Sequence, residues 1–338
     1  MSLSLDTYLK GVATDATLKP VAETIAQLAK AAVEVQRAIS TGHLSGQPRA
    51  GETGRNASGE AQKALDLFAD EAFLGAARAS PVFAYGSEEQ DDPVVLGAGS
   101  LALAIDPLDG SSNIETNISV GTIFSLLPVL PAHREAPAEA YRQPGTRQLA
   151  AGFFVYGAQL LLVMTVGAGT RSFIHIAERG SFVLLNADTV VPAATLEYSV
   201  NASNRRHWSS GVVRYIEDVE AGEEGPRGRN FGMRYVGSLV AETYRILQRG
   251  GVFLYPADQR SGYQEGRLRQ LYEANPIAFC IEQAGGAATD GATRILDLVP
   301  SGLHARIPLV FGSQCEVETI AGYVCARPPH ESTPSQGK

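Results

Sequence analysis

Two aspartates stand three residues apart at the end of an apolar run, and a Gly-Ser-Ser segment follows them: Asp106, Asp109 and residues 110–112. Residues 101–105 predict a short buried strand, and the proline after Asp106 predicts a turn that brings both carboxylates and the Leu108 carbonyl together. Hard divalent cations prefer oxygen ligands of this kind. A Gly-Ser-Ser segment at the start of a helix can bind a phosphate with its amides and hydroxyls. The pattern indicates metal-assisted phosphate chemistry, and its alternative is an ordinary Asp-Gly turn with a serine cap.

Further acidic residues could complete such a site. Glu273 lies in an apolar segment, where a carboxylate usually has a partner or a metal ion. Taken singly, the other candidates are typical of solvated surface charges: Glu60, Asp66, Glu88 and Glu89. Hydrolysis of a phosphate ester by water needs cations at the phosphoryl oxygens and a carboxylate that takes the proton of the water. The six histidines are dispersed without metal-binding spacing, so the prediction rests on carboxylates.

The composition is that of a globular protein and limits the class of partner. The 338 residues are 44% hydrophobic and 19% charged, with a net charge of -8, which argues against a nucleic-acid surface. The longest apolar run, residues 160–166, is far shorter than the roughly 20 residues that span a bilayer, so we expect no membrane partner. Three scattered cysteines and an N-terminus without signal-peptide character predict a reducing, cytoplasmic location.

The elements that would position these residues follow from apolar spacing. We expect helices over residues 20–39 and 61–77, joined by a mobile, glycine-rich loop over residues 41–59. A proline-rich surface loop is expected over residues 128–146. Short apolar runs around it predict strands over residues 119–127, 150–156, 159–165 and 181–185. In the second half we expect helices over 238–249 and 268–283, strands over 251–255 and 308–312, and a closing helix.

This order of elements predicts a layered α/β protein with two domains. We place the boundary near residue 190, which gives an N-terminal domain over residues 1–189 that holds the glycine-rich loop and the metal motif. A C-terminal α/β domain would cover residues 190–326. Residues 327–338 are rich in Pro, Ser and Gly and are expected to form a flexible tail.

Five segments, spaced in order along most of the chain, resemble class I fructose-1,6-bisphosphatases of the lithium-sensitive sugar-phosphatase superfamily. They are Asp106–Asn113, Val120–Phe124, Arg234–Ser238, Phe253–Pro256 and Leu271–Pro276. The resemblance implies a five-layer αβαβα fold whose C-terminal domain binds a sugar bisphosphate. It implies hydrolysis of the 1-phosphate of fructose 1,6-bisphosphate to fructose 6-phosphate and phosphate. The cofactor would be two to three Mg²⁺ ions per subunit, with Mn²⁺ or Zn²⁺ as alternatives.

The resemblance also implies roles for individual residues. The metal ions would be held by Glu88, Asp106, the Leu108 carbonyl, Asp109 and Glu273. Asp66 and Glu89 would accept the proton of the attacking water, and Glu60, where the family usually has Asp, would act near a third metal ion. The phosphate that is cleaved would meet Asp109, Gly110, Ser111 and Ser112. The second phosphate would meet Asn201, Tyr235, Tyr255 and Arg267.

Quaternary structure and regulation follow from the same resemblance. In the family, an arginine matching Arg234 reaches the site of the neighbouring subunit, which implies at least a dimer and favours a homotetramer. Arg267 replaces a common lysine and can still bind phosphate bidentately, whereas Asn204 replaces a tyrosine and loses an aromatic contact. The family's AMP site uses a Thr-Gly-Glu helix entrance and a Lys-Tyr pair. This chain has Thr17–Pro20 and Ser100-Leu101 there, so we expect AMP not to inhibit.

Three alternatives remain open. Sedoheptulose 1,7-bisphosphate could be the substrate or a second substrate, because residues 114–117 depart from the usual Ile-Asp pair. An inositol monophosphatase would share the acidic motif but would not need the residues assigned to a second phosphate. A sugar-phosphate sensor without catalysis would be expected to have lost one of the acidic metal ligands, and all of them stand in motif context.

Overall fold

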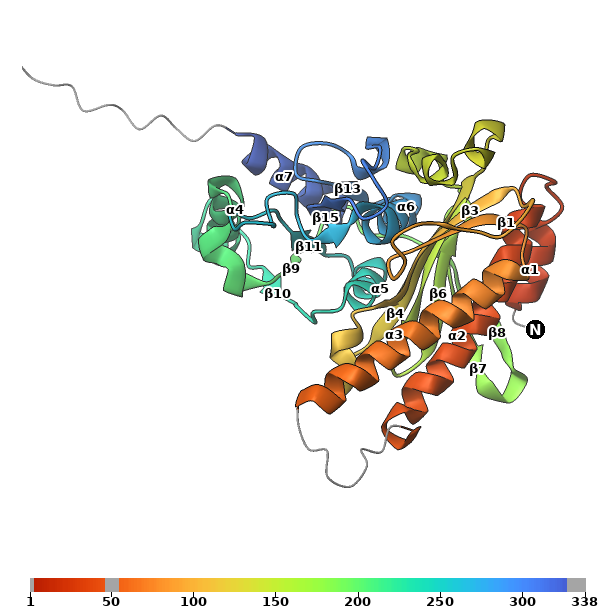
Figure 1. Cartoon of the computed structure of the whole chain (residues 1–338). Helices are drawn as coiled ribbons and strands as arrows, with labels where there is room; N and C mark the ends of the chain where they lie inside the picture. The colour runs from red at the N-terminus through yellow and green to blue at the C-terminus, as the bar shows by residue number, and fades with distance from the viewer. Residues whose placement is uncertain (1–2, 46–54, 327–338) are drawn as a thin grey trace, which may run out of the picture.

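Five layers of helix and sheet build the protein, in the order α, β, α, β, α (Figure 1). The computed structural model describes the backbone of residues 3–45 and 55–326, and the side chains of residues 3–41 and 62–326. Each layer buries an apolar face against the next, because a sheet or a helix with one apolar side must cover it. The layered α/β fold class is therefore confirmed.

The larger sheet has eight strands in the order β2-β1-β3-β4-β5-β6-β7-β8. Its members are β1 Val82–Ser87, β2 Val94–Val95, β3 Leu101–Asp109, β4 Val120–Pro128, β5 Ala150–Tyr156, β6 Leu160–Thr165, β7 Thr170–Ile176 and β8 Ser181–Thr189. Only the pair β1 and β3 is parallel, and the remaining neighbours are antiparallel. The predicted strand over 150–156 is confirmed, and the others are confirmed with shifted ends.

Three helices cover the outer face of this sheet: α1 Leu5–Val12, α2 Lys19–Ser45 and α3 Arg55–Arg78. Helix α2 presents a buried stripe at spacings of three and four residues, which includes Val21, Ile25 and Leu28. In α3, the Phe73 ring packs against Phe154 of β5. These contacts form the first apolar core, between the first and second layers.

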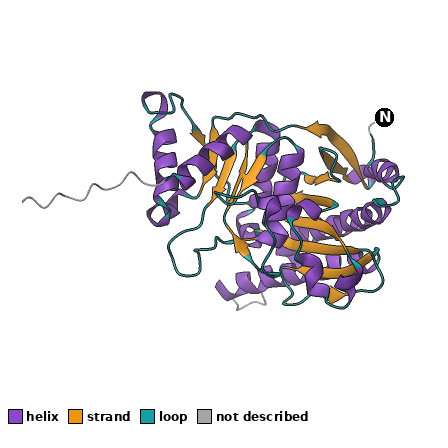
Figure 2. Cartoon of the chain, turned by 90° about the horizontal axis from the view of Figure 1, so that it is seen from above, coloured by secondary structure: helices purple, strands orange, loops and turns teal. Residues whose placement is uncertain are grey.

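The smaller sheet has the strand order β10-β9-β11-β15-β13. Its members are β9 Glu197–Val200, β10 Gly232–Met233, β11 Val252–Tyr255, β13 Ala287–Thr289 and β15 Leu309–Gly312. Helices α5 Leu239–Arg249 and α6 Asn275–Gln283 lie between the two sheets, and α4 Ser210–Glu220 and α7 Gln314–Cys325 cover the far side of the smaller sheet (Figure 1). Figure 2 shows the packing of helices against strands from above. Alternate residues divide between the two cores: Phe253 and Phe311 face the inner helices, whereas Val252 and Leu254 face the outer ones.

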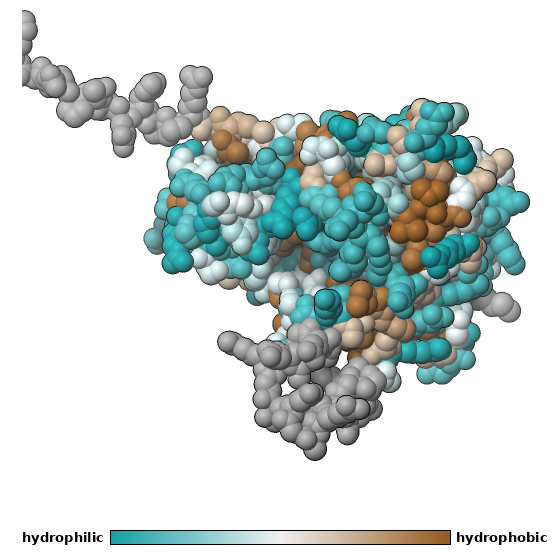
Figure 3. Space-filling view, in the orientation of Figure 1, coloured by the Kyte–Doolittle hydropathy of each residue, from teal (hydrophilic) through white to brown (hydrophobic). Residues whose placement is uncertain are grey.

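Short elements complete the chain. A two-stranded ribbon pairs β12 Leu268–Arg269 with β14 Arg306–Ile307. Single turns of 3₁₀ helix cover Ser111–Thr116, Pro131–Arg134, Pro137–Tyr141, Gly145–Arg147, Ala177–Arg179, Ala202–His207, Gly222–Glu224 and Ile295–Asp297. Among the described residues, no helix is both long and apolar enough to cross a membrane. Figure 3 shows one face of the molecule, on which hydrophilic residues predominate and apolar residues gather in a few areas.

Strand β3 does not end before Pro107, as we predicted, but continues to Asp109 through a bulge. Asp106 lies opposite Ile123, and Asp109 lies opposite Gly121, so two residues of β3 face one residue of β4. Residues three apart in a regular strand point to opposite faces, and the extra residue of a bulge restores them to the same face. The bulge therefore brings the two carboxylates together, which we had expected from a turn at Pro107.

The two predicted loops also differ from the structure. Helix α2 continues to Ser45 and α3 already begins at Arg55, and residues 46–54 lie outside the described part of the chain. These ends are helical because they hold no proline, and a glycine inside a helix costs only about 1 kcal/mol. In the segment 128–146, Tyr141 is buried and its hydroxyl donates to the Leu103 carbonyl at 3.2 Å. That segment is therefore partly core.

The helix predicted over 268–283 is wrong at its start. Residues 268–269 form β12, a five-residue π-helix follows over Gln270–Ala274, and α6 begins at Asn275. Pro276 suits the first turn of α6, because an N–H there would have no partner within the helix. The π-helix matters for function because it carries Glu273, and π-helical turns are frequent at functional sites.

Candidate active site

Three carboxylates from two separate elements meet in the interior. Asp106 and Asp109 come from the bulged end of β3, and Glu273 comes from the π-helical turn before α6. One oxygen of each side chain lies within 4.8 Å of an oxygen of the other two, and all three residues are buried. Asp109 Oδ2 has no hydrogen-bond partner among the described residues. A buried acceptor of this kind is costly unless a cation or donor reaches it.

Burial and mutual repulsion oppose the charges of this cluster. Burial raises the pKa of Asp109 to about 7, and the nearby charge of Glu88 adds to the effect. The pKa values of Asp106 and Glu273 are raised for the same two reasons, first burial and then Glu88. Like charges so close together cannot all ionise without compensation. A divalent cation would provide it, and an all-oxygen donor set fits Mg²⁺ in chemistry.

Arg269 is the cation that the chain itself brings to these carboxylates, and the sequence analysis missed it. Its Nε donates to Glu88 Oε1 at 3.0 Å, and its backbone N–H donates to a carboxylate oxygen of Glu273. Arg269 lies in β12, four residues before Glu273. Its placement within a segment that carries two candidate residues, Arg267 and Glu273, was the signal that could have identified it.

Glu89 and Asp66 form a second acidic pair beside the cluster. The pKa of Glu89 is raised by partial burial and by the charges of Asp66 and Glu88. The pKa of Asp66 is also raised, chiefly by burial, although a hydrogen bond with Ser111 counteracts the rise. A half-buried carboxylate with a raised pKa is suited to accept a proton near neutral pH.

A buried carboxylate fixes the segment that carries Glu88 and Glu89. Asp70 of α3 accepts hydrogen bonds from Tyr85 Oη at 2.7 Å, Ser87 Oγ at 2.6 Å and Gln90 Nε2 at 2.6 Å. These donors lie on both sides of the two glutamates, at the carboxyl end of β1. Asp70 therefore anchors the segment on both sides of Glu88 and Glu89. Nothing in the sequence indicates this role, and we did not predict it.

The Gly-Ser-Ser segment forms a turn next to the cluster. Gly110 has φ of 73° and begins the 3₁₀ helix Ser111–Thr116, a conformation that favours glycine. Ser111 Oγ accepts a hydrogen bond from Gln62 Nε2 at 3.0 Å, and Ser112 is exposed. The predicted helix start is confirmed as a short 3₁₀ helix. None of its six residues is buried.

One hydrogen bond connects this turn to the C-terminal half. Asn113 Nδ2 donates to the Gly237 carbonyl at 2.9 Å. The segment around Gly237 includes Tyr235 and leads into α5. The two halves of the predicted site are therefore in direct contact.

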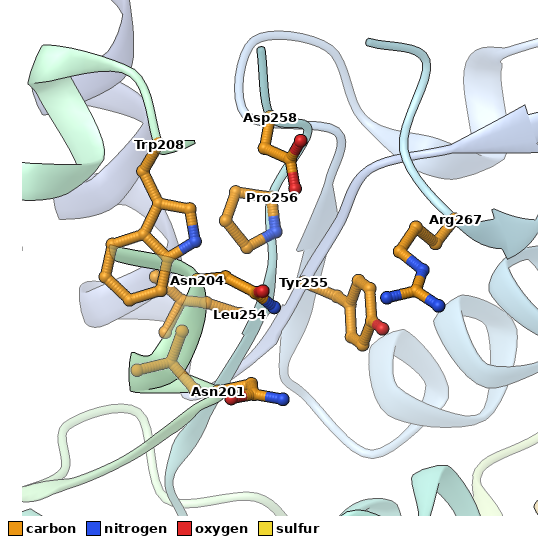
Figure 4. Close-up of a pocket in the computed structure, with 9 residues that line it drawn as sticks. Asn201, Asn204, Trp208, Leu254, Tyr255, Pro256, Asp258 and Arg267 are labelled. Carbon is orange, nitrogen blue, oxygen red and sulfur yellow. The ribbon is translucent and has the colours of Figure 1, made fainter. Parts of the chain in front are cut away.

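The residues assigned to the second phosphate converge in the C-terminal half. Asn201, Tyr255 and Arg267 line one pocket, and Figure 4 shows the Arg267 guanidinium beside the Tyr255 ring. Tyr235 adjoins them, because its hydroxyl interacts with Asn201 and the charge of Arg267 acts on its pKa, which partial burial raises. The pKa of Tyr255 is raised chiefly by burial, and Glu273 contributes to the rise. The charge of the carboxylate cluster therefore acts on a residue of this pocket.

For three predicted site residues, the structure does not show the predicted contact. The Leu108 side chain is buried and its N–H donates to Asp106 Oδ1 at 3.0 Å. The Glu60 side chain lies outside the described part of the structure. Arg234 is 56% exposed, with its Nε 3.7 Å from Glu197 Oε1, and it does not join the pocket within its own chain.

A layered fold that brings a buried carboxylate cluster, a Gly-Ser-Ser turn and a cationic pocket together defines a phosphatase. Family models support this directly. The model described as the N-terminal domain of fructose-1,6-bisphosphatase matches residues 9–187, and that of its C-terminal domain matches residues 191–325.

Named relatives agree over most of the chain. The chain is 50% identical to "Fructose-1,6-bisphosphatase class 1" of Rhizobium meliloti (strain 1021), over 95% of this chain and 93% of the relative. It is 52% identical to the protein of that name from Azorhizobium caulinodans, over 90% and 93%. The holo crystal structure of Leishmania major fructose-1,6-bisphosphatase aligns with a TM-score of 0.87 at 29% identity, over 96% of this chain and all of that one. The chain belongs to the fructose-1,6-bisphosphatase family.

Proposed function

We propose that the protein hydrolyses the 1-phosphate of fructose 1,6-bisphosphate with the help of Mg²⁺, which yields fructose 6-phosphate and phosphate. The observation that supports this most is the meeting of Asp106, Asp109 and Glu273 beside a Gly-Ser-Ser turn. Two to three Mg²⁺ ions per subunit, or Mn²⁺ or Zn²⁺ in their place, would neutralise phosphoryl charge and lower the pKa of water.

The chain's own residues divide the work. Glu88, Asp106, Asp109, Glu273 and the Leu108 carbonyl would hold the metal ions. The turn at 110–112 would orient the phosphate that is cleaved, with N–H and hydroxyl donors. Glu89 and Asp66 would take the proton of the attacking water, while the bond between phosphorus and the sugar oxygen breaks. Glu60 remains a candidate for assistance in this step.

The other end of the substrate would occupy the pocket shown in Figure 4. Arg267 would bind the second phosphate bidentately, and Tyr235, Tyr255 and Asn201 would donate further hydrogen bonds. A cationic pocket next to an acidic cluster favours a substrate with two separated phosphates over a monophosphate.

We propose that the protein works as a cytoplasmic homotetramer in which Arg234 reaches the site of a neighbouring subunit. The Arg234 side chain supports this role because it is 56% exposed. The cytoplasmic location is supported by Cys280, Cys315 and Cys325, which are all free thiols.

We also propose that AMP does not inhibit the enzyme. Leu101, the first residue of β3, is 1% exposed because it packs in the core between the outer helices and the larger sheet, and it offers a nucleotide neither a charge nor a hydroxyl group. Ser100 next to it pairs through its backbone with Pro81 and Val129. The side chains at these two positions therefore provide no cation for a phosphate.

Phosphate release from fructose 1,6-bisphosphate, with Mg²⁺ and after EDTA, tests the proposal. We expect turnover that EDTA abolishes and that AMP leaves unchanged. Sedoheptulose 1,7-bisphosphate is assayed in parallel as the alternative substrate. The variant Asp106→Asn, which loses a proposed metal ligand, should lose activity. Its matched control is Glu139→Gln, a change at an exposed surface ion pair, which should keep activity. No phosphate release from the fructose substrate would refute the proposed activity, and inhibition by submicromolar AMP would refute the regulatory part.

A further inference from the structure

Arginines and tyrosines alternate in a series beside the pocket. The Arg260 guanidinium lies 4.7 Å from the Tyr263 ring centre, Arg267 lies 4.6 Å from the same ring, and Arg267 also lies 6.0 Å from the Tyr255 ring. Figure 4 shows the last of these contacts at the edge of the pocket. Arg267 is thus in contact with two aromatic rings, of which only Tyr255 lines the pocket.

Backbone hydrogen bonds hold Tyr263 in this place. Its carbonyl accepts from the N–H of Asp258 at 3.1 Å and of Gly266 at 3.1 Å, and its own N–H donates to the Arg260 carbonyl at 3.0 Å. The Asp258 carboxylate, which is buried, accepts from Arg260 Nε at 3.0 Å. These bonds fix the backbone of the turn 258–266 at Tyr263, and the ring of Tyr263 lies against the guanidinium groups of Arg260 and Arg267.

The backbone that carries Arg267 is also fixed, whereas burial does not restrain its side chain. Gly266 has φ of 83°, and a Cβ added there would lie 2.3 Å from the carbonyl carbon of Ile307, so only glycine fits against β14. The Arg267 side chain itself is exposed. An exposed arginine has many rotamers and loses that freedom when it binds a ligand.

We infer that Tyr263 is a positioning residue for the second phosphate: its ring holds the Arg267 guanidinium ready to bind that group. This inference rests on the proposed function. A ring against the face of a guanidinium leaves the N–H donors in its plane, where a phosphate oxygen can accept them. Because the rotamer is selected before the ligand arrives, affinity for the second phosphate rises without any contact between Tyr263 and the substrate.

Kinetics of Tyr263→Leu test the inference. We expect KM for fructose 1,6-bisphosphate to rise about two- to five-fold, the size of a cation–π contribution at an exposed site, with kcat unchanged. Tyr263→Phe keeps the ring and should restore the wild-type KM. Fructose 1-phosphate has no second phosphate, so its KM should be the same in all three proteins. Tyr8→Leu removes another arginine–tyrosine contact, with Arg171 at 5.2 Å, and is the matched control.

Binding of fructose 6-phosphate, measured by calorimetry, gives a readout that needs no turnover. We expect Tyr263→Leu to weaken it by the same factor as KM. An unchanged KM and affinity, an equal effect on fructose 1-phosphate, or the same loss in Tyr263→Phe would each overturn the inference. A wild-type protein that binds fructose 6-phosphate but releases no phosphate would overturn the proposed function alone, and the binding series would still decide the role of Tyr263.

Discussion

Replacing Asp109 by Asn should stabilise the metal-free protein while it removes activity. Burial and the charge of Glu88 raise the pKa of Asp109 to about 7, against 3.8 for the free side chain. Between these two values the folded chain retains a proton that the unfolded chain has released. The folded state of the metal-free protein therefore loses stability as the pH rises from about 4 to about 7.

The size of the effect follows from that pKa. A pKa of about 7 in place of 3.8 corresponds to about 4 kcal/mol above pH 7, because each unit is worth about 1.36 kcal/mol. Asparagine has nearly the shape of the aspartate but carries no charge, so Asp109→Asn should recover this energy at pH 8. An unfolding entropy of about 2.1 cal/mol/K per residue gives about 0.7 kcal/mol/K for 338 residues. The midpoint of thermal unfolding should therefore rise by about 6 °C.

The assay is thermal unfolding after EDTA treatment, at pH 5 and pH 8, for wild type and Asp109→Asn. Wild type should be less stable at pH 8, whereas the variant should show a weaker dependence on pH. Added Mg²⁺ should stabilise wild type far more than the variant, because only wild type keeps the full set of ligands. Phosphate release should fall on the order of a thousandfold in the variant, as expected when several kcal/mol of metal-assisted stabilisation are lost.

The control is Glu139→Gln, where the carboxylate is 52% exposed and an ion pair contributes little. It should leave both the pH dependence and the Mg²⁺ effect unchanged. If metal-free Asp109→Asn unfolds at or below the wild-type temperature at pH 8, the electrostatic reasoning is wrong.

Three further predictions concern the supports of the site. Asp70→Ala should lower the free energy of unfolding in urea by about 3 to 5 kcal/mol, because three donors, two of them buried, lose their acceptor. Asp70→Asn should cost less, and equal costs would contradict this reasoning. In Asp66→Asn, the pH below which the remaining activity declines should be lower than in wild type, because the charge of Asp66 helps to raise the pKa of Glu89. A shift of this pH to a higher value would disprove the prediction. Gly121→Ala should lower the free energy of unfolding by about 1 to 3 kcal/mol, because the added Cβ would lie 2.3 Å from a backbone oxygen of β5. The control Gly75→Ala adds a Cβ in open space on α3 and should leave the free energy of unfolding unchanged or raise it.

Much of the fold was predictable because its signals are local. The apolar spacing in residues 20–39 predicted α2, and the uninterrupted apolar run over 150–156 predicted β5. The carboxylates of the cluster were also predicted, although their grouping rested on the resemblance to a family and not on the spacing alone. Strand β1 was not predicted, because its short apolar run ends in Gly86 and Ser87, which are typical of a turn.

Other features depend on contacts between distant segments. Asp70 reads in the sequence as one more charge on a helix, and only the fold places it against Tyr85 and Ser87. The ion pair of Arg269 with Glu88 joins residues 181 positions apart. Pro107 predicted a turn, whereas the pairing of β3 with β4 keeps it inside a strand as a bulge. Such outcomes depend on which strand lies alongside, which no local pattern specifies.

The position of Glu273 in the sequence affects when the carboxylate cluster forms during folding. It is separated from Asp109 by 164 residues, and it enters the cluster only when the middle helical layer has packed against the larger sheet. During synthesis the N-terminal half emerges first, with two of the three carboxylates but without the third. Contacts of such long sequence separation form late in folding. Affinity for the proposed metal ions would therefore be acquired late in folding. The recovery of Mg²⁺ binding during refolding would report when the middle helical layer docks against the larger sheet.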